Sequence, residues 1–149
     1  MGAFTIFLAV VAGVAGSVQV AVMSKLGDRV GIFGAVAWAA TLTAVLAVAV
    51  LLVAKQSLGP FTAAARQPVW LWSGAAMSVI IVLGITLAGS RIGVIATVSV
   101  LLAGQFAAGA VIDQYGLLGA ERVPVNWVRI FGIVLLGIGA LLTLSLIHI

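Results

Sequence analysis

The stretch GIFGAVAWAATLTAVLAVAVLLVA, residues 31–54, contains no charged side chain and is closed by Lys55. About 20 predominantly apolar residues are enough for a helix to cross the hydrocarbon core of a bilayer. The whole chain of 149 residues is 64% hydrophobic and only 7% charged, whereas soluble domains carry about 25% charged residues. Because this composition cannot cover a soluble fold with polar groups, we expect the bilayer to be the solvent.

Outward from this run, similar apolar stretches recur along the chain and predict an all-α integral membrane protein with about five transmembrane helices. We expect one transmembrane domain over residues 1–149, because no linker separates a second one. The predicted spans are 3–23, 31–54, 69–89, 93–112 and 128–147.

The predicted spans end at residues with a physical reason to end them. Pro68 suits the first turn of the third helix, and Asn126 can cap the fifth. Residues 89–92 read as a tight turn that joins spans three and four in a helical hairpin. Charged residues and a glycine end the first span, and tryptophans at 70, 72 and 127 anchor helices at interface depth. The residues that end the first span are Lys25, Gly27, Asp28 and Arg29.

The basic residues divide almost evenly between the two sides of the predicted bundle. One side has Lys55, Arg66, Arg122 and Arg129, and the other has Lys25, Arg29 and Arg91. The positive-inside rule needs a clear bias to fix one orientation. The chain either inserts one way by a small margin or inserts both ways and pairs as an antiparallel homodimer, with an oppositely oriented paralogue as the fallback partner.

Several kinds of chemistry are disfavoured by what the chain lacks. It has no cysteine, and its three acids lie in loops or at span ends, so we expect no metal site, no cofactor and no enzymatic activity. The basic residues are scattered singly, which argues against nucleic-acid binding and suits lipid headgroups. His148 lies in LSLIHI, residues 144–149, which matches the translation of a sequencing adapter. Our hypothesis is that this segment is an artefact, the alternative is a natural helix end, and His148 is given no role.

Polar side chains inside a span usually face the interior of the bundle. Serine and threonine can bond back to their own helix and are weak signals. An amide needs a partner on another helix or a wet cavity, so Gln105, near mid-depth, is either a structural hydrogen-bonding residue or a substrate contact. For Gln19 the structural role is favoured. The candidates for a substrate pathway lined by spans one to four are Gln105, Gln19, Trp38, Ser99 and Ser17.

Asp113 and Arg129 each lie at the unfavourable end of a helix dipole. A carboxylate at a helix C-terminus and a cation at a helix N-terminus are both disfavoured. Both residues fall on the same side of the membrane, so an ion pair between them would relieve both conflicts and close the loop between spans four and five. The favoured role is helix pairing, and the alternative is a gate or an ion-binding carboxylate.

Small residues recur four apart in several spans, for example Gly104 and Ala108, and span five contains Gly132, Gly137 and Gly139. Such spacing lets helix backbones approach closely in lipid. We favour ordinary packing within one subunit over a dimer interface on span four or five.

The segment GQFAAGAVIDQYGLLG, residues 104–119, resembles the "GQ…D-x-x-G-L-L-G" signature of the YdcZ-type family in the drug/metabolite transporter superfamily. Matches in order along the chain support the resemblance, which covers all but LSLIHI. They are Gly16 with Gln19, Leu26-Gly27, Pro68 with Trp70, Trp72 and Gly74, Arg91-Ile92-Gly93, and Arg122, Pro124 and Arg129 through Gly132. The chain departs at Met23, where the family usually has asparagine, and at Ala75, where it has a second glycine.

The resemblance implies a multi-pass protein of the bacterial inner membrane, half the size of the ten-span members of the superfamily. We therefore expect a transporter half that moves a small metabolite or drug-like molecule by alternating access, as an antiparallel dimer in the lipid bilayer. The alternative is a non-transporting scaffold or an accessory subunit of another carrier.

Overall fold

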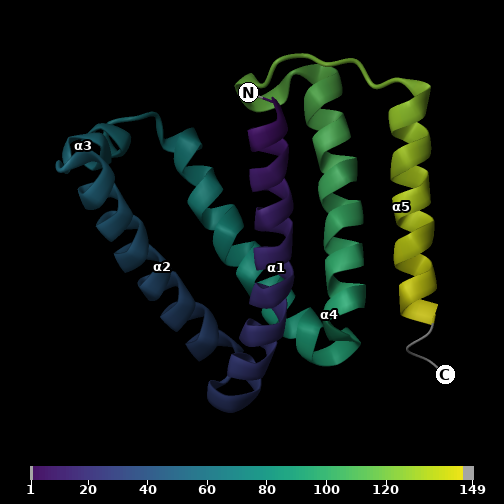
Figure 1. Ribbon diagram of the computed structural model, residues 1–149, viewed down its shortest axis with the longest axis horizontal. Helices are drawn as coiled ribbons and strands as arrows, with labels where there is room; N and C mark the ends of the chain where they lie inside the picture. The colour runs from purple at the N-terminus through teal and green to yellow at the C-terminus, as the bar shows by residue number, and fades with distance from the viewer. Residues whose placement is uncertain (1, 146–149) are drawn as a thin grey trace. The chain divides into compact units, whose positions relative to one another are not determined.

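The computed structural model describes residues 2–145, and all regular structure within that range is helical (Figure 1). The predicted all-α membrane architecture is therefore confirmed. His148 and most of LSLIHI lie outside the described residues. The elements are α1 (Gly2–Val30), α2 (Ile32–Lys55), α3 (Gly59–Ala65), the 3₁₀ turn η1 (Val69–Trp72), α4 (Ser73–Tyr115), the 3₁₀ turn η2 (Leu117–Gly119) and α5 (Trp127–Ser145).

Four helical stretches within residues 2–145 are long and apolar enough to cross a membrane. The predicted span 31–54 corresponds to α2, with ends shifted by a single residue. The stretch Val69–Tyr115 contains both the third and the fourth predicted spans. It is divided at Gly93, whose φ of 78° and ψ of 170° are not helical. The four stretches thus accommodate the five predicted spans.

Two helix breaks are made by single glycines in a conformation that other residues avoid. Gly31, between α1 and α2, has φ 81° and ψ 152°, and Gly93 lies in the same region. This backbone region is essentially restricted to glycine. A Cβ atom at either position would meet nothing within 4 Å, so the requirement for glycine comes from the backbone and not from crowding.

The break inside α4 corrects the predicted turn. Residues 89–92 are helical, and the chain changes direction only at Gly93. Gly89 has no positive φ, and the Ser90 hydroxyl donates to the Leu87 carbonyl as it would in a continuing helix. A single residue therefore replaces the predicted four-residue turn.

Two other boundaries differ from the sequence prediction. Helix α1 continues through its charged residues to Val30, because lysine, aspartate and arginine fit helical backbone, and Arg29 in the last turn complements the helix dipole. Pro68 precedes η1 and is not part of the first helical turn. The sequence prediction also missed α3, which begins with a glycine and a proline followed by alanines within FTAAA.

The described chain forms two compact units, and each is described by itself. One unit, unit 2, comprises Val22–Ser90. Its core is formed by Met23, Ala35 and Val36, against which five partly buried apolar residues pack. Met23 therefore lies among apolar side chains, which explains how methionine is accommodated where the resemblance leads one to expect asparagine. The five packing residues are Leu26, Ile32, Ala39, Val82 and Leu83.

A glycine allows two helices of unit 2 to come into close contact. A Cβ atom on Gly27 of α1 would lie 2.7 Å from Cγ2 of Thr86 in α4. Thr86 is fully buried, and its hydroxyl donates to the Val82 carbonyl. Gly27 is therefore required for packing and does not end the helix.

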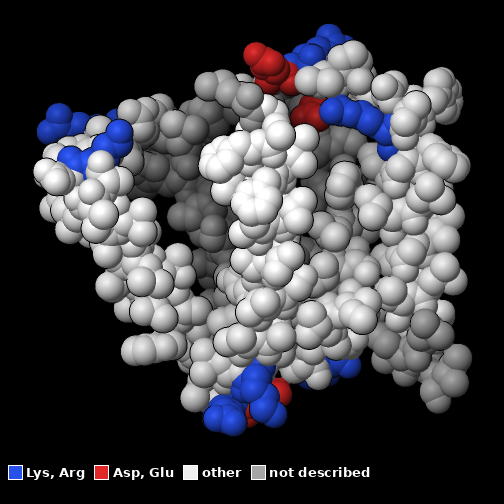
Figure 2. All heavy atoms as spheres, in the orientation of Figure 1, with Lys and Arg blue, Asp and Glu red and all other residues white. Residues whose placement is uncertain are grey.

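The other unit, unit 1, comprises Met1–Ala21 and Arg91–Ile149. Within it, α1 begins at the same end at which α4 finishes and α5 starts (Figure 1). In each unit the charged side chains gather at the helix ends, and the middle of the helices is uncharged (Figure 2). This distribution is the one expected for helices that cross a hydrocarbon layer.

Candidate functional site

A cleft of about 410 Å³ lies between the second half of α4 and α5 in unit 1. On α4, Gln105, Gly109 and Asp113 follow one another at intervals of four residues and so share one face of the helix. Arg129 begins the lining of the cleft on α5. The remaining lining residues, Phe106, Ala110, Gly132, Ile133 and Leu136, give it apolar walls.

The cleft is open because its walls carry glycine where larger side chains would fill it. A Cβ atom on Gly109 or Gly132 would meet nothing within 4 Å. The same is true of Gly104, Gly137 and Gly139. These glycines therefore do not bring α4 and α5 into close contact, and the expectation that they serve packing within one subunit stays a prediction.

The polar groups of the cleft lie at two levels. Gln105 and Asp113 are eight residues apart, which corresponds to about 12 Å along the helix axis. The Gln105 side chain is exposed to the cleft and makes no hydrogen bond with the described residues. Asp113 and Arg129 are the charged residues of the described lining, and their charges compensate each other.

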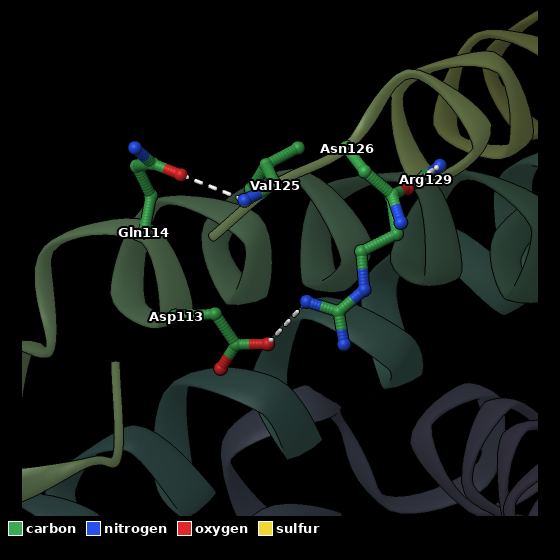
Figure 3. A network of polar contacts seen from close by, with 5 residues as sticks. All are labelled: Asp113, Gln114, Val125, Asn126 and Arg129. Carbon is green, nitrogen blue, oxygen red and sulfur yellow. Dashed lines mark hydrogen bonds and ion pairs between the residues drawn. The ribbon is translucent and has the colours of Figure 1, made fainter. Parts of the chain in front are cut away.

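Asp113 and Arg129 form an ion pair at the end of the cleft where α4 finishes (Figure 3). Nη1 of Arg129 donates to Oδ2 of Asp113 at 3.2 Å. The contact uses one oxygen and one nitrogen, although an arginine and a carboxylate often form two parallel bonds. The Arg129 side chain is 45% exposed, and the Asp113 side chain is 38% exposed. The contact predicted from the helix dipoles is present in the structure.

The loop from residue 116 to 126 is fixed to the end of α4 by three hydrogen bonds. The Val125 amide donates to Oε1 of Gln114 at 2.7 Å (Figure 3), and Nε of Arg122 donates to the Gln114 carbonyl at 3.0 Å. The Val123 amide donates to the Asp113 carbonyl at 2.9 Å. The bonds from Arg122 and Val123 satisfy backbone carbonyl groups that a helix C-terminus leaves unpaired.

The start of α5 is capped as the sequence predicts. Oδ1 of Asn126 accepts from the Arg129 amide at 2.9 Å. Because Arg129 is held at the first turn by this bond, its side chain starts from a fixed point beside Asp113. The cap and the loop contacts thus position the ion pair.

The structure brings only some of the predicted pathway residues together. Gln105 lines the cleft, and Ser99 lines an adjoining cleft of about 350 Å³ that shares Leu136 with it. Ser17 donates to the Gly13 carbonyl of its own helix, and Gln19 is exposed on α1. Trp38 is 63% exposed on α2, in unit 2. The cleft that contains Gln105 is lined by spans four and five, and not by the predicted spans one to four.

Two residues of the site were not given a role from the sequence. Gln114 and Arg122 hold the loop beside the ion pair, eight residues apart along the chain. Their signal was present in the sequence, since an amide directly follows Asp113 and an arginine lies within the loop. Neither position identifies its partner without the path of the loop.

Comparison with known proteins adds one result. A family model described as "Putative inner membrane exporter, YdcZ" matches residues 4–142 of this chain. The match includes the whole cleft and the loop beside it. No curated protein and no solved structure matches the chain.

Proposed function

The chain belongs to the YdcZ family, whose description reads "Putative inner membrane exporter", and we propose that it works as one half of a transporter. The observation that carries the proposal is the cleft between α4 and α5. It combines apolar walls with the amide of Gln105 and a compensated pair of charges at one end. Ligand sites in proteins have this character, mostly apolar with a few placed polar groups.

The proposed cargo is a small polar or amphipathic molecule. Gln105 offers two donors and an acceptor that are free among the described residues. The charges of the cleft cancel, which disfavours a strongly cationic cargo. A volume of about 410 Å³ falls within the range of small-molecule sites.

The proposed assembly is an antiparallel dimer that works by alternating access. The nearly even distribution of basic residues supports it, because such a chain can insert in both orientations. Two oppositely oriented copies would have the inverted symmetry of many secondary transporters. Helix α5 leaves apolar side chains exposed, with Trp127 at 85% and Val128 at 78%, so lipid or a second copy must cover it.

The test of the cargo site is a ligand screen on the purified protein. A panel of metabolites and antimicrobial compounds is scored by the shift in melting temperature, and Gln105→Ala is compared with Gln67→Ala, an amide outside the cleft. A compound that stabilises the native protein and the Gln67 variant, but not the Gln105 variant, supports the site. Equal stabilisation of both variants places the ligand elsewhere.

The test of the assembly is the accessibility of tags on both ends of the chain in membranes. Dual insertion predicts that each tag is labelled on both sides. If every molecule exposes its N-terminus on one side, an antiparallel homodimer is excluded and an oppositely oriented paralogue becomes the required partner. The alternative role as a scaffold or accessory subunit is distinguished by liposomes that contain this protein alone, because a scaffold supports no flux there.

A further inference from the structure

The ion pair at the end of the cleft has unused bonding capacity on both of its members. Arginine carries five N–H donors, and a carboxylate has two acceptor oxygens. The contact between Arg129 and Asp113 joins one nitrogen to one oxygen. Within residues 2–145, Oδ1 of Asp113 and the other guanidinium nitrogens of Arg129 have no further hydrogen bond. Both side chains line the cleft and are partly exposed.

The charge of a ligand decides whether it can use that capacity without leaving a charge unpaired. An anion that binds Arg129 would lie beside the Asp113 carboxylate, and a cation that binds Asp113 would lie beside the guanidinium. A charge without a partner in an apolar cleft is costly. A zwitterion can place its carboxylate on Arg129 and its ammonium on Asp113, so that all four charges are paired.

The walls next to the pair determine what else the ligand carries. Phe106, Ile133 and Leu136 are apolar, and Gly109 and Gly132 leave the space between them empty. A zwitterionic head at the ion pair would therefore direct an apolar group along the cleft toward Gln105. The volume of the cleft accommodates an amino acid with a large apolar side chain.

We propose that the α4–α5 cleft binds an apolar zwitterion, with its carboxylate on Arg129, its ammonium on Asp113 and its side chain between Phe106 and Leu136. The inference deepens the proposed transport function and rests on it for the biological role of the site. Binding itself is independent of transport and can be measured separately.

The experiment uses the purified full-length protein in detergent and three probes that share one side chain and differ in which head-group charges they keep. L-phenylalanine is the zwitterion, its methyl ester retains only the ammonium, and its N-acetyl derivative retains only the carboxylate. Affinity is measured by calorimetry and by the shift in melting temperature. L-leucine and L-tryptophan serve as further zwitterions of different size.

The expected result is saturable binding of the zwitterion, with each blocked form weaker by about ten- to a hundredfold. This ratio corresponds to one lost charge-assisted hydrogen bond. Gly109→Leu fills the cleft without replacing either member of the ion pair and should abolish binding. Gly84→Leu adds the same side chain on α4 outside the cleft, where a Cβ atom meets nothing within 4 Å, and should leave binding intact.

Equal or tighter binding of a blocked form overturns the inference, as does the absence of binding by all three zwitterions at millimolar concentration. If Gly109→Leu fails to fold, Gly132→Leu fills the same cleft from α5 and replaces it. A different compound from the panel that binds and crosses liposomes would leave the transport proposal standing while this inference fails. Zwitterion binding without flux would leave this inference standing while the transport proposal fails.

Discussion

Replacing Asp113 by asparagine separates the two roles proposed for the ion pair. The substitution keeps the size of the side chain and removes its charge. At 3.2 Å, the Coulomb attraction of two unit charges is about 1.3 kcal/mol in bulk water and about 5 kcal/mol at the lower effective dielectric near a protein surface. Exposures of 45% and 38% place this pair closer to the first value.

Ordering the two side chains opposes the attraction, and exposed pairs contribute about 0–1 kcal/mol in total. We therefore expect Asp113→Asn to lower the free energy of unfolding by about 1 kcal/mol or less, with a fall in melting temperature of about 2–4 °C. Zwitterion binding should weaken by about ten- to a hundredfold. The ion pair would then contribute more to ligand binding than to the stability of the fold.

The assay is a thermal double-mutant cycle of Asp113→Asn and Arg129→Gln in detergent, combined with calorimetry of the same variants. Asp28→Asn is the control, since it removes an acid that has no ion pair within the described residues. A coupling energy above about 3 kcal/mol would refute the reasoning, because only a buried structural pair gives that value. Unchanged zwitterion binding by the Asp113→Asn variant would also refute the reasoning.

Three further substitutions test the fold through thermal unfolding. Gly93→Ala should cost about 1–3 kcal/mol because its φ of 78° suits only glycine. Gly84→Ala, in helical backbone with open space around the new Cβ, should be neutral or stabilising by up to about 1 kcal/mol; equal effects would contradict the backbone argument. Gly27→Ala should cost about 1–3 kcal/mol through contact with Thr86, and Thr86→Ser, which removes Cγ2, should restore stability; a failed rescue would contradict this packing. Asn126→Ala should cost about 1 kcal/mol because it removes the 2.9 Å cap, and Asn126→Asp should cost much less because it keeps an acceptor oxygen. Equal losses in the two variants would contradict the capping role.

The location of the helices could be predicted from the sequence because membrane solubility imposes long apolar runs. The span 31–54 is closed by Lys55, and α2 ends at that residue. The turn at residues 89–92 was misplaced because several small and polar residues there look suitable for a turn. Only the backbone conformation shows that the change of direction is made by Gly93.

The candidate site could be predicted in part. The ion pair of Asp113 and Arg129 follows from two misplaced charges and the order of the helices, which are both readable in the sequence. The cleft could not be predicted from the sequence, because it depends on empty space beside Gly109 and Gly132. Small residues in a helix predict close packing equally well. The sequence leaves open whether Gln105 bonds to another helix or faces a cavity; the described residues provide no hydrogen-bond partner for it, and it lines the cleft.

The central claim is that this protein alone moves a small molecule across a membrane through the α4–α5 cleft. The most direct measurement is uptake, into liposomes that contain only this protein, of the compound that stabilises it most in the ligand screen. The account predicts saturable uptake that is lost in Gly109→Leu and retained in Gly84→Leu. Uptake that is absent from liposomes containing folded, ligand-binding protein, or that survives Gly109→Leu unchanged, would contradict it.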